Sequence, residues 1–153
     1  MPTVWRVVKR RHAATAFDGQ AARRFGGRWN SPGRRAVYVS DSKSLATLEM
    51  LVHLDVAQPL PRLVAFAFDL DGKLIERLPA ERLPRQWRTL QGSSATRRIG
   101  DEWLAAGRSL ALAVPSAIVP EEINYVLNPE HPAFARLRVG RPMSFLLDPR
   151  LLR

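Results

Sequence analysis

Cysteine is absent from the 153 residues of this chain. Its absence excludes a disulfide framework, a cysteine nucleophile and zinc or iron–sulfur centres held by thiolates. Long apolar runs are missing too, since no stretch approaches the ~20 apolar residues that span a bilayer. The first residues, MPTVWRVVKRRH, lack the apolar segment of a signal peptide. We therefore expect a cytoplasmic protein with no membrane association.

Lysine is scarce among the basic residues, with three Lys against 21 Arg. With 14 acidic residues the formal net charge is +10. Arginine binds phosphate bidentately and lysine does not, so the excess indicates an anionic partner: nucleic acid, a nucleotide or an acidic protein. A GC-rich coding sequence that favours Arg codons accounts for most of these residues equally well.

The length predicts one domain, residues 1–153, with one hydrophobic core. Apolar, β-branched runs predict strands at residues 3–8, 36–39, 62–70, 73–76, 109–114 and 143–148. The turn signal Asp71–Gly72 precedes the fourth of these strands. Strands outnumber helices and are rarely separated by one, which predicts an α+β fold with a mixed or antiparallel sheet and flanking helices.

Two helices and one helical turn are predicted between these strands. One helix is capped by Ser40 or Asp41 and runs to about Leu54. The other covers Thr96 to Ala106 and stops at Gly107. The turn covers residues 20–24 of a stretch, 9–35, that is otherwise loop. Residues 79–92 are predicted to be irregular, and residues 115–132 to form a long loop with at most one turn of helix.

Glu49 is the most informative single residue. On its predicted helix, Leu45, Leu48 and Val52 share its face, and Met50, Leu51 and Leu54 cover much of the rest. This pattern predicts a largely buried helix, in which a carboxylate must be paired or must line a cavity. An Arg partner, or His53 four residues along, would make Glu49 a structural residue. A cavity would make it a catalytic candidate.

The segment FGGRWNSPGRRAVYVS, residues 25–40, is the second signal. Its two adjacent glycines allow a close backbone approach or a positive φ. Arg28 follows them beside an aromatic residue, which suits an anionic, planar ligand such as a nucleotide. The alternative is a tight turn with an exposed Arg and a core Trp. Tyr38 lies on the strand face opposite Val37 and Val39, where its ring stacks on a ligand or packs in the core.

Three further positions bear on chemistry. Arg6, inside an apolar strand, requires an anion partner or a solvated face. Ser116 ends a strand without the GxSxG motif of a serine nucleophile, which favours a hydrogen-bonding role. The histidines, at positions 12, 53 and 131, have no metal-binding spacing, so no metal site is expected.

Taken together these segments resemble the RES domain, the toxin half of RES–Xre toxin–antitoxin pairs. The matching blocks run in order along the chain: WR at 5–6, ARRFGGRWNSPG at 22–33, AVYVSDS at 36–42, LEMLVHL at 48–54, IGDEWL at 99–104, PSAIVPEEINYVLNPEHP at 115–132 and FLLDPRL at 145–151. The family is named for an Arg, a Glu and a Ser, which correspond here to Arg28, Glu49 and Ser116.

The resemblance implies a fold similar to that of ADP-ribosyltransferases and an enzyme that consumes NAD. NAD would be the substrate, and no metal or true cofactor is implied. The implied roles are pyrophosphate binding by Arg6 and Arg28, stacking near the nicotinamide by Tyr38, hydrogen bonding to the nicotinamide ribose by Glu49, and substrate positioning by Ser116. Asn124 is a weaker candidate for substrate binding.

Three functions remain under consideration. The first is a toxin that cleaves NAD by hydrolysis or phosphorolysis, with an Xre-type helix-turn-helix antitoxin that occludes the cleft. In that complex, a homodimer is allowed and DNA is contacted only through the antitoxin. The second is an ADP-ribosyltransferase that modifies a protein. The third, well below these, is a basic nucleic-acid-binding module, which predicts clustered arginines and a steep salt dependence of binding.

Overall fold

The structure is a computed structural model that describes residues 1–55, 57–90 and 92–152. Its strands are β1 (Thr3–Lys9), β2 (Val37–Ser40), β3 (Leu63–Asp69), β4 (Ile75–Arg77), β5 (Ala111–Pro115), β6 (Ile123–Leu127) and β7 (Met143–Phe145). Its α-helices are α1 (Gln20–Phe25), α2 (Lys43–Leu51) and α3 (Ser94–Ala106). Short 3-10 turns are η1 (Arg10–Thr15), η2 (Gly72–Leu74), η3 (Ala80–Arg82), η4 (Pro132–Arg136) and η5 (Pro149–Leu152).

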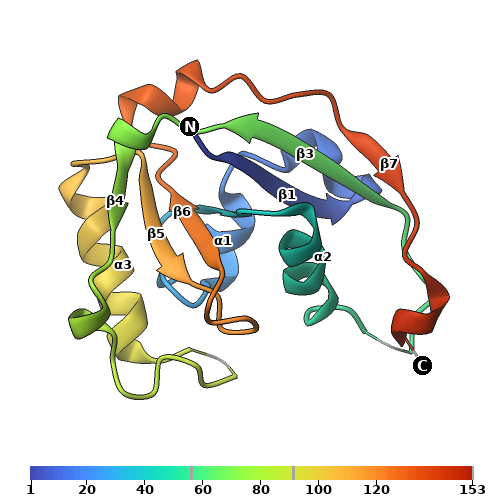
Figure 1. Cartoon of the computed structure of the whole chain (residues 1–153), viewed down its shortest axis with the longest axis horizontal. Helices are drawn as coiled ribbons and strands as arrows, with labels where there is room; N and C mark the ends of the chain where they lie inside the picture. Colours follow the sequence, from blue (N-terminus) through green and yellow to red (C-terminus); the bar gives the residue numbers. More distant parts are fainter. Residues whose placement is uncertain (56, 91, 153) are drawn as a thin grey trace.

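The described strands form one sheet in the order β4-β5-β6-β2-β1-β3-β7. Only the β4–β5 pair is parallel, and the other neighbours are antiparallel. At its centre β1 and β2 pair at a single position, Trp5 with Ser40, so the sheet divides there into two halves. Figure 1 shows β4, β5 and β6 beside α3, and β1, β3 and β7 beside α2. The prediction of an α+β fold with a mixed sheet is confirmed.

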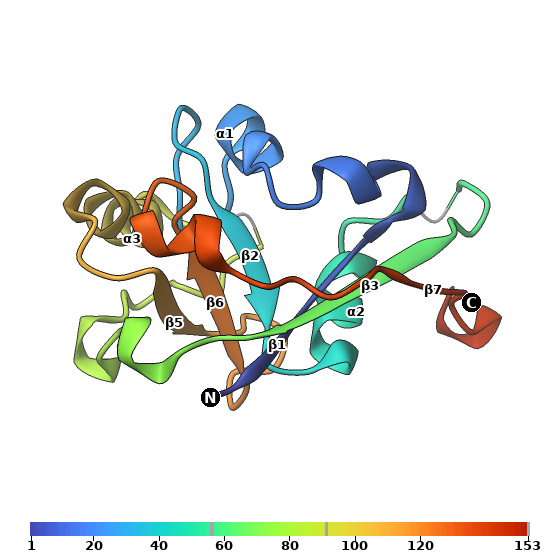
Figure 2. The ribbon, with the colours of Figure 1, turned by 90° about the horizontal axis from the view of Figure 1, so that it is seen from above.

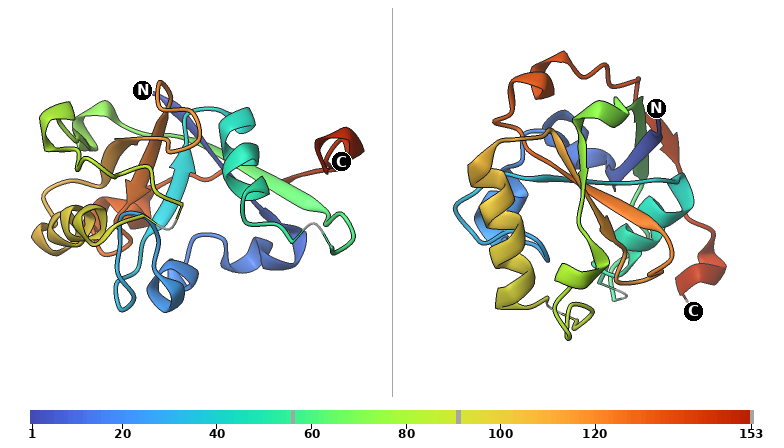
Figure 3. Two further views of the ribbon diagram at one scale, coloured as in Figure 1. Left: turned by 90° about the horizontal axis from the view of Figure 1, so that it is seen from below. Right: turned by 60° about the vertical axis from the view of Figure 1, so that its left-hand side comes forward.

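Both longer helices cover the same face of this divided sheet. Trp103 and Leu104 of α3 pack with Leu112 and Val114 of β5. Ala46 of α2 packs with Val7, Leu63 and Ala65 of β1 and β3. Strand alternation and the Trp5–Ser40 pair place both sets on one face. Figures 2 and 3 show the helices over different halves, with β2 between them.

The opposite face is covered by segments with little regular structure. One cluster there joins Val37 and Val39 of β2 to Phe134 and Leu137 of the chain after β6. Residue Phe17, in the loop after η1, makes edge-to-face contacts with two phenylalanine rings of β3. The sheet is therefore buried on both faces, and the divided region between α2 and α3 is where polar groups gather.

Helix α2 differs from its prediction at both ends, since it begins at Lys43 and ends at Leu51 rather than at about Leu54. Its N-cap is Ser42, whose side chain accepts a hydrogen bond from the Leu45 N–H, and neither Ser40 nor Asp41 caps it. Ser40 remains in the strand because it pairs with Trp5 and is buried. The helix is also less buried than predicted, since Leu48 and Val52 are 37% and 60% exposed.

The predicted loop at residues 115–132 was wrong, because strand β6 runs through its middle. The strand pairs with both β5 and β2. The four prolines of this stretch all lie outside β6, at positions 115, 120, 129 and 132, so none interrupts its hydrogen bonds. The prolines therefore flank β6, and their frequency in this stretch led to the prediction of a loop in place of a strand.

Strand β4 is present as predicted, but it does not pair with the strand before it. Residues 71–74 form a 3-10 turn, and β4 then lies at the far edge of the sheet, parallel to β5. A parallel neighbour requires a crossover connection, which α3 provides. The predicted turn at 20–24 is α1, and the predicted helix at 96–106 is α3, which ends at Gly107 with a φ of 64°. Between 79 and 92 the described residues form no strand and no helical element besides η3, and the rest are turns, bends or irregular; residue 91 lies outside them.

Candidate active site

The carboxylate of Glu49 is the centre of a polar network that joins distant parts of the chain. Its Oε1 accepts a hydrogen bond from the Ser116 hydroxyl at 2.8 Å and another from the Asn124 side-chain amide at 2.8 Å. No Arg or His53 pairs with it among the described residues. Two donors on one oxygen suit an ionised carboxylate. The second oxygen, Oε2, accepts no hydrogen bond from the described part of the chain and is the one available to a ligand.

Asn124 is held in turn by Ser40, a residue that the sequence suggested only as a helix cap. The Ser40 hydroxyl donates to Asn124 Oδ1 at 2.7 Å, and the two residues are opposite one another in the β2–β6 pair. This bond fixes which end of the Asn124 amide faces Glu49, because the oxygen is taken by Ser40 and the nitrogen is left to donate. The signal for Ser40 lies in strand pairing, which becomes visible only in the fold.

Ser116 is buried, and its hydroxyl oxygen is fully engaged. It accepts hydrogen bonds from the backbone N–H groups of Ile118 and Val119, both at 3.1 Å. Its proton is thereby directed to Glu49. The expected hydrogen-bonding role is present in the structure, because the two backbone N–H groups occupy both lone pairs of the hydroxyl oxygen while its proton is donated to Glu49.

Arg28 lies in the same neighbourhood, half-buried on the loop after α1. Its Nη1 donates to the backbone carbonyls of Trp87 and Thr89, at 2.6 and 2.7 Å. Burial lowers the pKa of Arg28; the negative charge of Glu49 acts in the opposite direction. The side chain is thus close enough to Glu49 for their charges to interact, although the two form no ion pair.

The glycines before Arg28 are required by the shape of its loop. Gly26 has a φ of 74°, which strongly favours glycine. A Cβ on Gly27 would lie 2.7 Å from the Tyr38 hydroxyl and 2.9 Å from Asn30 Oδ1. Trp29 is 2% exposed, so it is the core tryptophan that the alternative interpretation predicted.

Tyr38 supports this loop through its hydroxyl. The hydroxyl donates to Asn30 Oδ1 at 2.6 Å and accepts from the Trp29 N–H at 3.2 Å. Burial raises the pKa of the Tyr38 phenol, which therefore remains protonated. Its ring packs against the Trp29 cluster and keeps part of its surface accessible. The structure thus gives Tyr38 a packing role, and stacking on a ligand stays a prediction.

Arg6 is placed apart from Glu49. Strand alternation puts it on the face opposite Trp5, whose partner Ser40 belongs to the Glu49 network. Its guanidinium donates to the backbone carbonyls of Ala16 and Tyr38, at 2.6 and 2.9 Å, where β1 and β2 diverge. Burial lowers the pKa of Arg6 to about 10. Backbone carbonyls are thus its hydrogen-bond partners, and the negative charge of Asp18 raises its pKa in opposition to burial.

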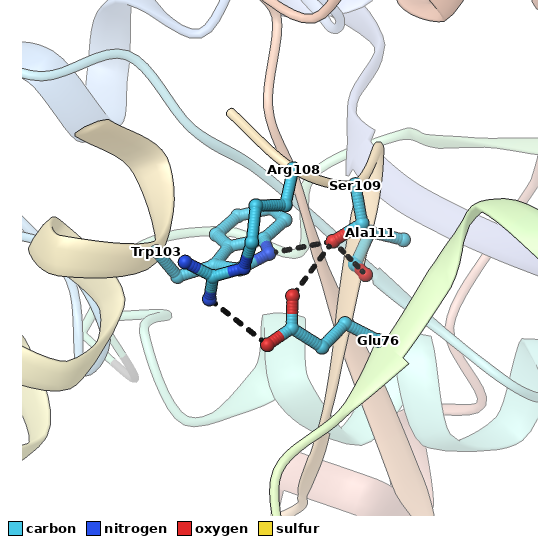
Figure 4. A network of polar contacts seen from close by, with 5 residues as sticks. All are labelled: Glu76, Trp103, Arg108, Ser109 and Ala111. Carbon is cyan, nitrogen blue, oxygen red and sulfur yellow. Dashed lines mark hydrogen bonds and ion pairs between the residues drawn. The ribbon is translucent and has the colours of Figure 1, made fainter. Parts of the chain in front are cut away.

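A second polar network, which does not include Glu49, lies at the β4 edge of the sheet. Figure 4 shows its residues. The indole of Trp103 donates to Ser109 Oγ at 2.8 Å, and Ser109 donates to Glu76, which also forms an ion pair with Arg108. It borders a pocket of about 200 Å³. Among the described residues, no group of three or more His, Asp or Glu side chains is placed to hold a metal ion. No described helix has the length and apolarity needed to cross a bilayer.

The divided mixed sheet and its helices define an α+β protein. A polar site lies where the two half-sheets meet, and in it a serine and an asparagine hold one carboxylate beside an arginine. The chain belongs to the RES domain family, which matches residues 3–148. The family resemblance drawn from the sequence is therefore confirmed.

Curated relatives cover nearly the whole chain. "Toxin Res" of Yersinia enterocolitica is 40% identical over 149 residues, which are 97% of this chain and 98% of that protein. The "Prs ADP-ribosylating toxin" of a Sphingobium species is 34% identical over 154 residues, with 97% and 96% covered. Among solved structures, the M. tuberculosis MbcT–MbcA toxin–antitoxin complex contains a chain with the same fold, at a TM-score of 0.69 and 21% identity, with 98% of this chain and 86% of that chain covered.

Proposed function

We propose that this chain is a toxin that breaks the bond between nicotinamide and ribose in NAD. The observation that carries the proposal is the Glu49 carboxylate, whose Oε1 is held by Ser116 and Asn124 while Oε2 accepts no hydrogen bond from the described residues. A carboxylate fixed in this way is preorganised to stabilise positive charge that develops on a substrate. The toxin names of relatives over nearly the full chain support the biological role.

The proposed chemistry uses this charge directly. As the C1′–N bond breaks, its electron pair passes to the nicotinamide nitrogen, and the ribose gains oxocarbenium character. Glu49 Oε2 stabilises that positive charge and hydrogen-bonds the ribose. Nicotinamide leaves as a neutral molecule, so no strong acid is required. An oxygen of water or phosphate then bonds to C1′, and a proton on water passes to solvent.

The other predicted residues act around Glu49 in this proposal. Ser116 and Asn124 position the carboxylate, and Asn124 is itself oriented by Ser40. Arg28 binds the pyrophosphate, because three of its five N–H groups remain after its two bonds to carbonyls. Tyr38 shapes the Arg28 loop, and the accessible part of this half-buried residue faces the nicotinamide in this proposal. Arg6, committed to two carbonyls on the other face, is the weaker pyrophosphate candidate.

The test measures nicotinamide release from NAD, with and without added phosphate. We expect Glu49→Ala and Glu49→Gln to lose about 10³-fold in kcat, because a preorganised charge facing the transition state is removed. Glu121→Gln, at an exposed acidic position, is the matched control and should keep wild-type activity. Full NAD cleavage by a folded Glu49→Ala variant would refute the proposed mechanism. The products, ADP-ribose or its phosphate ester, identify the acceptor.

A second candidate uses the same site with a protein as the acceptor of ADP-ribose. The name of the Sphingobium relative, an ADP-ribosylating toxin, favours it. Incubation of the chain with labelled NAD and a cell extract separates the two. Label on protein, abolished by Glu49→Gln, supports transfer, whereas label only in small molecules supports cleavage.

We further propose a cognate antitoxin as the partner in the cytoplasm. The solved MbcT–MbcA structure is a toxin–antitoxin complex that contains a chain with this fold, which supports a partner of this kind. An Xre-type helix-turn-helix protein that occludes the site, with a homodimer of the toxin in the complex, is the specific form that we propose. Co-expression with the neighbouring gene product, followed by sizing of the purified complex and a test of DNA binding with and without the antitoxin, examines each part separately.

A further inference from the structure

We propose that Arg88 is a second binding residue for the diphosphate of the dinucleotide substrate, acting together with Arg28. The inference rests on the proposed function and names a residue that neither the sequence motifs nor the Arg–Glu–Ser set of the family includes. Three observations support it: the position of the segment around Arg88, the unused N–H donors of Arg28 and Arg88, and the positive charges of these two side chains.

Arg28 fixes the backbone on both sides of Arg88. Its Nη1 donates to the carbonyls of Trp87 and Thr89, the residues immediately before and after Arg88. Gly92 also lies close to the Arg28 backbone, since a Cβ there would lie 3.2 Å from Arg28 Cα. The position of Arg88 in space is therefore set by Arg28.

The side chain of Arg88 reaches the other half of the site. Its Nε donates at 3.0 Å to the carbonyl of Ala117, the residue after Ser116. Ser116 in turn donates to Glu49. Arg88 thus connects the Arg28 segment to the turn that holds the catalytic carboxylate, and it lies where both can act on one ligand.

The two guanidinium groups retain many donors. Each has five N–H groups; Arg28 uses two on carbonyls and keeps three, and Arg88 uses one and keeps four. Ion pairs in the described ranges join Arg108 to Glu76 and Arg150 to Asp148, so neither Arg28 nor Arg88 forms an ion pair there. The charge of Glu49 acts on Arg28 from beyond ion-pair distance.

The charges of this pair favour an anionic ligand. The positive charge of Arg88 contributes to lowering the pKa of Arg28, so the two groups are near enough to repel each other. A ligand with two linked negative groups relieves that repulsion, and phosphate oxygens match the planar fork of each guanidinium. A diphosphate has this chemistry, and a nicotinamide nucleoside without phosphate does not.

The test compares substrates with and without the diphosphate. We expect Arg88→Gln to raise KM for NAD about tenfold, the loss of one charge-assisted contact, with kcat within about twofold of wild type. For nicotinamide riboside, kcat/KM should be unchanged. Arg88→Lys, which keeps the charge without the fork, should give an intermediate KM. Arg85→Gln, an exposed arginine three residues away, is the matched control and should change neither substrate's kinetics.

The possible outcomes distinguish the assignment of Arg88 from the proposed function. An unchanged KM for NAD in Arg88→Gln, or an equal loss with nicotinamide riboside, overturns the assignment of Arg88. If the wild-type chain does not cleave NAD, the proposed function fails, and calorimetric titration of inorganic diphosphate then tests Arg88 alone. Binding that weakens about tenfold in Arg88→Gln and is unchanged in Arg85→Gln sustains the anion site; equal binding by all three proteins overturns it.

Discussion

The hydrogen bond from Asn124 to Glu49 leads to a prediction whose magnitude depends on pH. Replacing Asn124 with Asp keeps the shape of the side chain but places a second carboxylate where the amide now lies, 2.8 Å from Glu49 Oε1. At that separation two charges repel by about 3 to 6 kcal/mol for an effective dielectric constant of about 20 to 40. The pair avoids this repulsion by sharing a proton, which raises the pKa of the introduced carboxyl in the folded state.

The direction of the pH dependence follows from this rise in the pKa of the introduced carboxyl. When a carboxyl has a higher pKa in the folded state than in the unfolded state, the free energy of unfolding falls as pH rises from the unfolded pKa through the folded pKa. We expect Asn124→Asp to be less stable than wild type by about 3 to 5 kcal/mol at pH 7.5 and by only about 1 kcal/mol at pH 4.5. In acid the protonated carboxyl donates to Glu49 as the amide does.

Urea unfolding followed by tryptophan fluorescence measures the difference, because Trp29 and Trp103 are 2% and 3% exposed and report on the core. Asn124→Ala, which removes the donor without adding charge, should be destabilised equally at both pH values. The double variant Glu49→Gln with Asn124→Asp should lose the pH dependence. A destabilisation of Asn124→Asp that does not change with pH, or that keeps its pH dependence in the double variant, would show that the two side chains do not share this bond.

Two further predictions concern the loop that carries Arg28. Gly100→Ala should destabilise the fold by about 3 kcal/mol or more, because its Cβ would lie 1.6 Å from the Trp29 carbonyl oxygen where α3 crosses the loop. Gly72→Ala is the control, since no atom lies within 4 Å of its new Cβ. Equal urea midpoints for the two variants would contradict the close packing. Tyr38→Phe should cost about 2 to 4 kcal/mol, since it leaves the buried Asn30 Oδ1 and the Trp29 N–H without their partner; a loss in the unfolding free energy under about 0.5 kcal/mol would refute the support role.

Local patterns predicted most of the elements because these depend on neighbouring residues. Helix α3 has its stop at Gly107, and β1, β2, β3 and β5 are apolar runs whose character is visible without their partners. The predictions were wrong where strand pairing with a distant segment determines the structure. Strand β6 reads as a proline-rich loop until β5 and β2 pair with it on both sides. Strand β4 follows a turn signal, yet its partner is β5, across the α3 connection.

The candidate site divides in the same way. The sequence by itself determined the family, the α+β class and the three residues that define it, because Arg28, Glu49 and Ser116 lie in blocks specific enough to be recognised. It could not determine what each touches. The bonds of Glu49 and Ser40 span 67, 75 and 84 residues along the chain, and only tertiary structure brings such groups together.

The folded structure also decided the placement of two arginines outside the Arg–Glu–Ser set of the family. Arg6 lies in a matching block, but its side chain is on the face opposite Glu49 and holds backbone carbonyls where the sheet divides. Arg88 lies in a segment without any pattern, but the bonds to its neighbours from Arg28 bring it to the site. Residue type and spacing determine which chemistry is available to the chain, whereas the hydrogen bonds of the folded backbone determine where that chemistry is located.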